Sequence, residues 1–231
     1  LDFYKHLMQL NNPDPDDIFT MSLEKLKLLF NYFEQLMLMG LPNLSQMISI
    51  HKISNEPQTI EPALDLPLAP VTFVSGHMQT SDPIKVDFAN KNIGGGVLKH
   101  GCCQEELMFL SNPELIGLMS LVDTLGPYES LVVEGVTQYS KINYYGYDLR
   151  FAGTVPVEDR VNQTIIIMDA NDYRGRKEEQ YLESNKRSEL QKAINGFGGI
   201  ESSEFISTGN WGGGIFNGDF QLKFMIQLLA K

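Results

Sequence analysis

Short β-rich runs alternate with helical runs from about residue 71 onward, and this alternation restricts the possible folds more than any other feature. Residues 164–168 (TIIIM) are continuously apolar, which is typical of a strand covered on both faces. Strands are predicted at residues 71–74, 84–88, 131–136 and 164–168. Helices are predicted at residues 105–110, 114–125, 183–194 and 221–229. The pattern therefore indicates a layered α/β domain with helices on both faces of its sheet.

The N-terminal part has a different character. Residues 22–25 (SLEK) resemble a helix start, and Gly40 followed by Leu41-Pro42 is expected to end that helix. The apolar positions between them recur at helical spacing: Leu26, Leu29, Phe30, Phe33, Leu36 and Met37. Residues 41–70 are rich in proline and serine and predict an irregular connection. We therefore expect a helical extension and connection over residues 1–70 and a catalytic core over residues 71–231, forming one compact unit.

Composition and charge narrow the class of ligand. With a net charge of -11, the chain has no general basic surface for a nucleic-acid backbone, so an anionic ligand would have to be held by backbone N–H groups. No apolar run has the length of a membrane span, and no zinc spacing is present, so neither a membrane, a metal nor a cofactor is expected. The adjacent Cys102 and Cys103 indicate a reducing, intracellular compartment, the nucleus or the cytoplasm. The start lacks methionine and a signal-peptide pattern, so we expect a piece of a longer protein.

The first candidate site is a strand, residues 84–88, that runs into a loop containing Gly94, Gly95 and Gly96. Glycines allow positive φ and a close approach of the backbone to a ligand, and successive N–H groups in such a turn can bind an anion. The same glycines are also typical of a flexible turn between a strand and a helix. The nucleotide-hydrolase phosphate loop is excluded because no Gly-Lys-Ser/Thr ending follows.

The second candidate is Gln104-Glu105-Glu106, just before an apolar run that predicts a helix. Acidic residues in a first helical turn are favoured by the helix dipole without any function. Only seven residues separate this motif from the glycines, however, so a ligand on the loop would lie within reach of the carboxylates. Because consecutive helical side chains point about 100° apart, the two acids are expected to have different roles. Glycoside cleavage uses such a pair, one of them as an acid.

A second glycine loop, residues 208–216, follows later in the chain. Its glycines and aromatics predict either a second backbone cradle or a tight turn with core aromatics. Among the tyrosines, Tyr147 beside Gly146 is the candidate for stacking on a nucleobase, and Tyr139, Tyr144 and Tyr145 are interpreted as core or surface residues. No histidine is expected to be catalytic, although His100 lies between the first two motifs.

Together, the three glycines, seven intervening residues and Gln104-Glu105-Glu106 resemble the signature of the poly(ADP-ribose) glycohydrolases. The resemblance extends to residues 86–90, 138–140 and 208–212, to Tyr147, and to the predicted helix at residues 22–37, in the family's order along the chain. It implies a macrodomain-type fold, three-layer α/β/α with a mixed central sheet and an N-terminal helical extension. It also implies hydrolysis of ribose–ribose O-glycosidic bonds in poly(ADP-ribose), mainly from the free end, with release of ADP-ribose. Family members usually continue beyond this chain's last residues into a further strand.

Residue roles follow from the match with the family motifs. Glu106 is expected to be the general acid/base, Glu105 to hold ribose hydroxyls, and Asp87 to be a supporting acidic residue. Asn90 and Gln104 are expected to bind ribose, and Tyr147 to contact the adenine side. The other expected substrate contacts are Gly94, Gly95, Gly96, Asn210, Trp211, Gly212, Gly213, Gly214, Ile215, Phe216, Met78 and Gln79. The expected partners are ADP-ribose, its polymer and poly(ADP-ribosyl)ated proteins, without general DNA binding, and the chain is expected to be monomeric.

Two other classes of function compete with a glycohydrolase. A non-catalytic macrodomain that only binds ADP-ribose has no need of the acid pair beside its diphosphate loop. A helical interaction scaffold does not account for two glycine loops.

Overall fold

The computed structural model describes residues 14–40, 47–57, 68–76, 78, 82–201 and 203–231. The chain divides into two compact units, each made of segments far apart in the sequence. Unit 1 contains Leu1–Ser49, Asn92–Asp123 and Glu134–Gln163, and unit 2 contains Ile50–Lys91, Thr124–Val133 and Thr164–Lys231. This division by contacts does not test the predicted division by sequence at residue 70, which stays a prediction.

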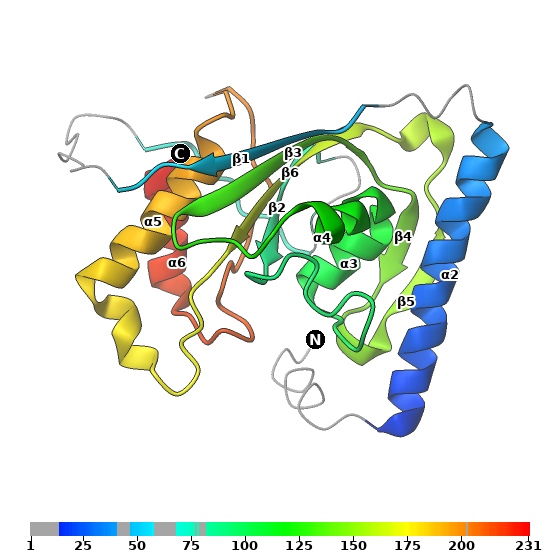
Figure 1. Ribbon diagram of the computed structural model, residues 1–231, viewed down its shortest axis with the longest axis horizontal. Helices are drawn as coiled ribbons and strands as arrows, with labels where there is room; N and C mark the ends of the chain where they lie inside the picture. The colour runs from blue at the N-terminus through cyan, green and yellow to red at the C-terminus, as the bar shows by residue number, and fades with distance from the viewer. Residues whose placement is uncertain (1–13, 41–46, 58–67, 77, 79–81, 202) are drawn as a thin grey trace. The chain divides into compact units, whose positions relative to one another are not determined.

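A four-stranded mixed sheet has the strand order β1-β3-β6-β2 (Figure 1). The strands are β1 (Ser49–Ser54), β2 (Ile84–Ala89), β3 (Glu129–Thr137) and β6 (Asn162–Asp169). β2 and β6 run parallel, with Val86 opposite Ile166. This arrangement confirms the strands predicted at residues 84–88, 131–136 and 164–168.

The core of unit 2 is built on β6, whose side chains from Ile165 to Met168 are fully buried. Burial on both faces is what the continuous apolar run predicted. On one face, Ile166 and Met168 belong to a cluster with two helices of the same unit, α5 (Glu183–Phe197) and α6 (Phe220–Ala230). The apolar cluster joins β2 and β6 to these two helices, both of which the sequence predicted.

Buried charge also lies within unit 2. Lys223 of α6 pairs with Glu189 of α5, and both side chains are almost completely buried. The Lys223 ammonium also lies 4.8 Å from the centre of the Trp211 ring, a cation–π contact. Burial lowers the pKa of Lys223, and the carboxylate of Glu189 acts against that shift. Lys223 therefore connects α6 to α5 through Glu189 and to the loop residue Trp211 through its ring.

Unit 1 contains the long helix α2 (Pro15–Met39), the helices α3 (Gln104–Ser111) and α4 (Leu118–Leu121), and an antiparallel pair, β4 (Ser140–Asn143) and β5 (Arg150–Thr154). Short 3-10 helices occupy Pro113–Gly117, Gly146–Asp148 and Val157–Asp159 here, and Lys177–Tyr181 in unit 2. None of the helices in the described part of the chain combines the length and apolar character needed to cross a membrane.

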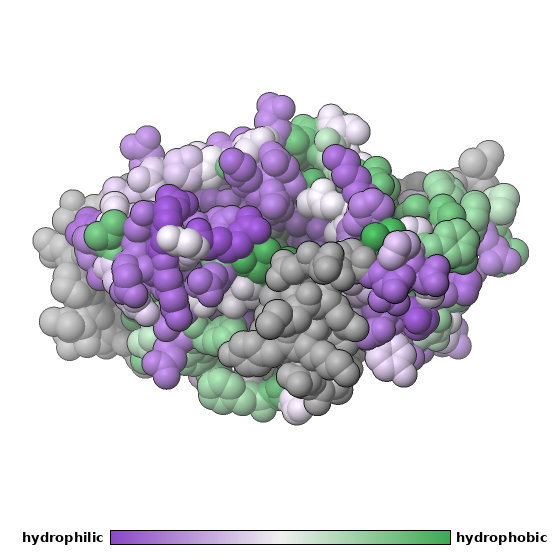
Figure 2. All heavy atoms as spheres, turned by 90° about the horizontal axis from the view of Figure 1, so that it is seen from below, coloured by the Kyte–Doolittle hydropathy of each residue, from purple (hydrophilic) through white to green (hydrophobic). Residues whose placement is uncertain are grey.

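Helix α2 contacts the rest of unit 1 through a mixed face, on which apolar Met21 and Leu28 are fully buried beside polar side chains. Glu24 accepts a hydrogen bond from Phe151 N at 2.8 Å, and Asn31 Nδ2 donates to Ser140 Oγ at 2.9 Å. The helix exposes a row of large apolar side chains. α2 lies at the right of Figure 1, and hydrophobic surface, coloured green, is seen at the right of Figure 2. The exposed apolar side chains of the helix are Phe19, Leu23, Leu26, Phe30, Phe33, Met37 and Leu38. Helical periodicity therefore identified the helix, but not which of its faces is buried.

The N-terminal helix begins earlier than predicted. Asp14 caps it by accepting a hydrogen bond from Asp16 N at 3.0 Å, and Pro15 supplies the fixed φ that suits a first helical position. The predicted start at Ser22 is wrong, because this side chain lies within the helix and donates to Ile18 O at 2.8 Å. The predicted stop is confirmed, since Gly40 caps the C-terminus with φ +72°.

Three other predictions were wrong. Residues 71–74 form no strand, although they are β-rich. The predicted irregular connection contains β1, and its residues 41–46 and 58–67 lie outside the described part. The predicted helix at residues 114–125 is a 3-10 helix followed by a single turn of α-helix that ends at Leu121.

Substituting Lys223→Met is expected to destabilise the chain by about 3–5 kcal/mol, because it leaves the Glu189 carboxylate buried without its cation. The double substitution Lys223→Met/Glu189→Leu is expected to recover most of this loss. Urea unfolding measures both. Lys186→Met, at an exposed lysine paired with Glu183 on α5, is the control and is expected to change little. A double variant as unstable as Lys223→Met would contradict the interpretation.

Candidate functional site

In unit 1, the first glycine loop and the start of α3 are joined through the two acidic side chains. Gly94 N donates to Glu105 Oε1 at 2.7 Å, and Gly96 N donates to Glu106 Oε1 at 2.9 Å. The second oxygen of Glu106, Oε2, accepts from Cys103 N at 2.7 Å. The structure thus brings together the two motifs that the sequence separated by seven residues.

The position of Glu106 on α3 explains part of this geometry. Cys103 is the N-cap residue and Glu106 is three positions further on, so the carboxylate reaches back to the cap N–H as in a capping box. Glu105 and Glu106 retain only 4% and 7% of their exposure. Adjacent helical positions send the two carboxylates to different N–H groups of the loop, which agrees with the expectation that they differ in role.

Glycine is required in this loop for two reasons. Gly94 and Gly95 have φ of +83° and +48°, the left-handed region that L side chains rarely adopt. A Cβ on Gly95 would lie 2.5 Å from Glu106 Oε1 and 2.7 Å from Glu105 Oε2. The backbone of residue 95 therefore approaches both carboxylates more closely than any side chain permits.

The N–H groups of this loop do not have the partners that we expected. Gly94 and Gly96 donate to the carboxylates, and Gly95 N donates to Asn92 O at 3.0 Å. From the family resemblance, we expected these three glycines to contact the substrate. Substrate contact by the three glycines stays a prediction, but in this structure their N–H groups hold the acid pair.

The turn that carries Tyr147 is connected to the start of α3. Gly146 N donates to Cys102 O at 3.1 Å, and the Tyr145 hydroxyl is hydrogen-bonded to the Cys103 thiol and to the backbone of Gln104. Tyr147 is half-buried, and partial burial raises its pKa. These hydrogen bonds connect the turn that carries Tyr147 with the start of α3. This helix carries Gln104 and the acid pair.

The remaining predicted residues belong to unit 2. Asp87 is fully buried within β2, Asn90 directly follows that strand, and Met78 is half-buried. Gln79 lies outside the described residues. Phe88 of β2 faces the second glycine loop, since a Cβ on Gly209 would lie 3.4 Å from its ring.

Trp211 lies at the base of the second glycine loop. It is fully buried, and its Nε1 donates to Met168 O of β6 at 3.0 Å. Gly212 has φ +68°, and a Cβ there would lie 2.5 Å from Ala170 Cβ. Phe216 is partly buried against the core of the unit. Trp211 and Phe216 therefore support this loop from the core side, which is the alternative that the sequence left open for its aromatics.

The N–H groups of the second loop differ from those of the first. Gly213 N donates to Asn210 O at 2.9 Å within the turn. Among the residues that the structure describes, none accepts a hydrogen bond from the N–H of Gly212, Gly214 or Ile215. This loop therefore has backbone donors that a bound anion can use.

The other aromatic and titratable candidates have ordinary positions. Tyr139 is buried, with its hydroxyl donating to Glu114 Oε1 at 2.9 Å, and Tyr144 is exposed. His100 is exposed on the loop and His51 lies on β1, while His6 and His77 are outside the described residues. The described part of the chain contains no group of three or more His, Cys, Asp or Glu side chains that could hold a metal ion.

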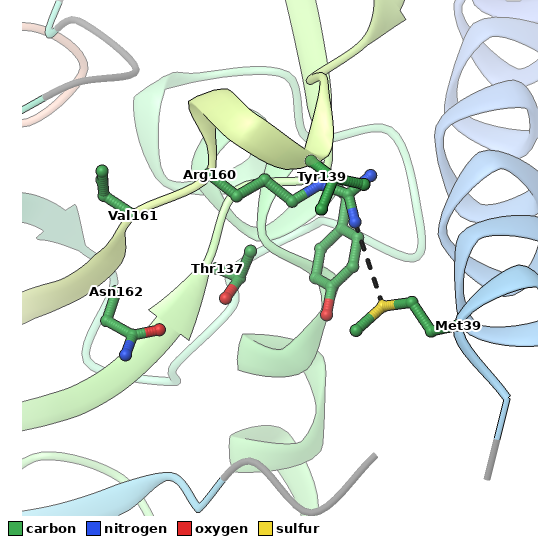
Figure 3. A pocket seen from close by; sticks show the side chains of 7 residues that line it. Met39, Thr137, Tyr139, Arg160, Val161 and Asn162 are labelled. Atoms are coloured by element: carbon green, nitrogen blue, oxygen red, sulfur yellow. Dashed lines mark hydrogen bonds between the residues drawn. The ribbon is translucent and has the colours of Figure 1, made fainter. Parts of the chain in front are cut away.

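Two shallow cavities lie away from the predicted residues. One, of about 160 Å³ in unit 1, lies beside Arg160, whose guanidinium stacks on Tyr139 at 4.9 Å and donates to Met39 Sδ at 3.9 Å (Figure 3). The other, of about 490 Å³ in unit 2, is lined by Ile53 of β1, by Asn55 just after that strand, and by α5 residues such as Asn195. Arg160 also donates to Gln35 Oε1 and Val155 O, so its donors serve the fold.

Sequence reasoning missed Lys25 of α2, whose Nζ donates to backbone carbonyl oxygens of the first glycine loop, among them Val97 O at 2.9 Å. The only signal was a lysine within a helical pattern, which normally indicates a solvated face.

The family model described as poly(ADP-ribose) glycohydrolase (PARG), macro domain fold, matches residues 64–231. Poly(ADP-ribose) glycohydrolase 1 of Caenorhabditis elegans is 34% identical, over 90% of this chain and 29% of the relative. Poly(ADP-ribose) glycohydrolase 2 of the same organism is 30% identical, over 90% of this chain and 48% of the relative. The chain thus spans less than half the length of these two relatives.

Among solved structures, the crystal structure of poly(ADP-ribose) glycohydrolase from Thermomonospora curvata aligns with 62% of this chain and 53% of its own. The identity is 17% and the TM-score 0.44, values too low to support a statement about the site.

The two cysteines are expected to resist alkylation in the folded chain. Burial raises the pKa of Cys102 to about 12 and that of Cys103 to about 11, and the thiolate is the reactive form. Iodoacetamide is expected to react slowly near pH 7.5 and faster as the pH rises, whereas the urea-unfolded chain reacts readily. Folding raises both cysteine pKa values. The chain is therefore expected to keep its full free energy of unfolding below the cysteine pKa of the unfolded state, about 8.5, and to lose part of it as the pH rises above that value. Equal rates for folded and unfolded chains near pH 7.5 would contradict the prediction.

Gly95→Ala is expected to cost more stability than Gly175→Ala. Both residues have positive φ, so each substitution introduces backbone strain of about 1–3 kcal/mol. A methyl group at 175 has nothing within 4 Å, whereas one at 95 displaces hydrogen-bonded carboxylate oxygens, a further loss of about 1 kcal/mol or more. Urea unfolding of both variants measures the difference. Equal losses would show that the carboxylates move aside without cost.

Proposed function

We propose that this chain, which belongs to the poly(ADP-ribose) glycohydrolase family, hydrolyses the ribose–ribose O-glycosidic bonds of poly(ADP-ribose). The observation that carries the proposal is the buried pair Glu105 and Glu106, hydrogen-bonded to the N–H groups of Gly94 and Gly96. A module that only binds ADP-ribose gains nothing from two buried acids at this position. The α/β class of the chain and the macrodomain fold of its family agree with the proposal.

In the proposed first step, Glu106 in its protonated form donates a proton to the ribose oxygen that leaves. The glycosidic C–O bond breaks as positive charge develops on the ring carbon and ring oxygen, an oxocarbenium-like state. Glu106 is then a carboxylate and takes a proton from the water that attacks the ring carbon. The products are a shortened polymer and ADP-ribose, and Glu106 is again protonated.

Glu105 is proposed to hold ribose hydroxyls. Its Oε1 is bonded to Gly94 N at 2.7 Å, which fixes the orientation of the carboxylate before substrate binds. Pre-oriented groups of this kind lower the barrier because no side-chain freedom is lost during reaction. Asn90 and Gln104 are proposed to bind ribose, with Asp87 as a buried supporting acid.

The diphosphate is proposed to bind to residues 210–216. The support is the set of N–H groups on Gly212, Gly214 and Ile215, which no described residue uses. In a chain of net charge -11, backbone donors are a source of positive potential that does not depend on lysine or arginine side chains. Tyr147, half-buried in unit 1, is proposed to contact the adenine side.

The finer points of the activity are part of the same proposal. Cleavage is proposed to proceed mainly from the free end of the polymer, on poly(ADP-ribosyl)ated proteins in the nucleus or cytoplasm. The chain is proposed to act as a monomer without general DNA binding, in line with its acidic charge.

Glu106→Ala is expected to reduce release of ADP-ribose from the polymer by about 10²–10⁴-fold, because general acid–base catalysis contributes a factor of that size. Affinity for ADP-ribose is expected to change by less than about tenfold. Polymer labelled with radioactive adenosine measures release, and calorimetry measures binding. Glu158→Ala, at an exposed acid of unit 1, is the matched control and is expected to retain full activity.

Unfolding of Glu106→Ala is measured alongside, because the substitution removes acceptors from Gly96 N and Cys103 N. Full turnover by the variant would overturn the proposed mechanism. A wild-type chain that binds ADP-ribose but releases none from the polymer would support a reader module instead. Activity is expected to survive EDTA, and a chelator-sensitive activity would count against the two-carboxylate mechanism.

A further inference from the structure

A buried ammonium group lies against the first glycine loop. Lys25, within α2, is 6% exposed, and its Nζ donates to Val97 O and Lys99 O at 2.9 Å each. It also contacts Gly101 O closely and Gly96 O at 3.4 Å. Four carbonyl oxygens thus share the three N–H donors of one ammonium. This number of backbone contacts makes Lys25 a centre around which residues 96–101 are folded.

The contacts connect Lys25 to the acid pair through a single residue. The carbonyl of Gly96 faces the Lys25 ammonium, and the N–H of Gly96 donates to Glu106 Oε1. The Gly96 carbonyl also accepts from Lys99 N and Gly101 N, which closes the loop into a tight turn. A shift of this turn therefore moves the N–H that orients Glu106.

The other end of the turn also lies against this carboxylate. A Cβ on Gly101 would overlap Glu106 Oε1, and one on Gly96 would lie 2.8 Å from Gly101 N. Gly96 and Gly101, whose carbonyls Lys25 binds, are therefore among the residues whose backbones lie against Glu106. Attraction between Lys25 and Glu106 acts against the lowering of the Lys25 pKa that burial causes.

Anchoring of the helix does not explain this lysine. α2 is already fixed to unit 1 by Glu24, which accepts from Phe151 N, and by Asn31, which contacts Ser140 and Thr154. No carboxylate among the described residues lies within 4.0 Å of the Lys25 ammonium. Burying a charge costs free energy, and an apolar side chain would attach the helix at less cost. The contacts with the carbonyl oxygens of the loop therefore explain why an ammonium group is buried at this position.

We propose that Lys25 is a positioning residue for the glycosidase reaction. It holds the turn of residues 96–101 so that Gly96 N and the backbone of Gly101 fix the Glu106 carboxylate. The inference rests on the proposed function for its kinetic readout. It also extends the catalytic machinery to α2, a helix that precedes the part of the chain matched by the family model, residues 64–231.

Lys25→Met tests the proposal, with Lys27→Met as its matched control. Lys27 is on the same helix, has the same charge and is largely exposed, and within the described part of the chain its ion pair is with Glu24, three positions earlier. Lys25→Met is expected to lower kcat on the polymer by about 100-fold, the effect of a misplacement near 1 Å. The affinity for ADP-ribose is expected to change by less than about threefold, because the loop N–H groups of residues 94–96 already have partners. Lys27→Met is expected to leave both unchanged.

Hydrogen exchange gives a second readout that does not need activity. In Lys25→Met, peptides covering residues 94–106 are expected to exchange faster, because the bonds from Lys99 N and Gly101 N to Gly96 O lose their support. Peptides from α5 are expected to exchange at the wild-type rate. An exchange change spread over the whole chain would indicate a general loss of stability and would overturn the proposal.

Lys25→Gln is made alongside, since its amide keeps N–H donors for the carbonyls while removing the charge. It is expected to fold and to lie between wild type and Lys25→Met in kcat. A near-wild-type kcat in Lys25→Met, or equal losses in Lys25→Met and Lys27→Met, would overturn the proposal. So would failure of both Lys25 variants to fold, since Lys25 would then be a folding requirement. If the wild-type chain releases no ADP-ribose, the proposed function fails, while hydrogen exchange still decides whether Lys25 holds the loop.

Discussion

The hydrogen bond from Gly96 N to Glu106 Oε1 joins a flexible loop to the rigid first turn of a helix. Loops with several glycines lose much conformational entropy when they become ordered, so such a loop needs strong fixed partners. Here the partners are carboxylates that α3 holds in place through its own N-cap contact with Cys103 N. The acids order the glycines and the glycines orient the acids, so the two motifs form one structural element.

Each of the two glycine loops lies beside a buried lysine. In unit 1, Lys25 binds carbonyl oxygens of residues 96–101. In unit 2, Lys223 lies against the Trp211 ring, and a Cβ on Gly212 would lie 3.2 Å from its Nζ. Lys223 has a carboxylate partner, Glu189, whereas the direct partners of Lys25 are backbone carbonyls. In both loops, a buried ammonium thus lies against backbone that carries no side chain of its own.

The sequence predicted most of the α/β elements because their apolar patterns are strong. Burial of residues 165–168 on β6 follows directly from a continuous apolar run. The start of α2 was mistaken because Ser22 followed by the acidic Glu24 resembles the first turn of a helix, while the actual cap, Asp14 before Pro15, lies eight residues earlier. β1 was missed because strand pairing is decided by neighbours that are distant in the chain, and its own residues alternate weakly.

Site residues were predictable where a motif is local and unpredictable where a contact is long-range. Glu105 and Glu106 were identified from their spacing to the glycines, and the structure joins them to that loop. Lys25 is 71 residues from Gly96 in the chain, and a lysine within a helix normally marks the solvated face, so nothing local indicated its burial. The sequence also did not predict the hydrogen-bond partners of the N–H groups at residues 94–96, because α3 contributes acceptors for them.

The different use of N–H groups in the two glycine loops bears on how an acidic chain can hold a polyanion. A chain of net charge -11 repels the phosphates of poly(ADP-ribose) at long range, so attraction has to be local and directional. In the first loop, the acid pair accepts hydrogen bonds from two of the N–H groups of residues 94–96, and Asn92 O accepts the third. The second loop keeps the N–H groups of Gly212, Gly214 and Ile215 clear of acceptors in the described residues. Backbone donors without an acceptor among the described residues are therefore found in the second loop, and the proposed diphosphate binding draws its support from them.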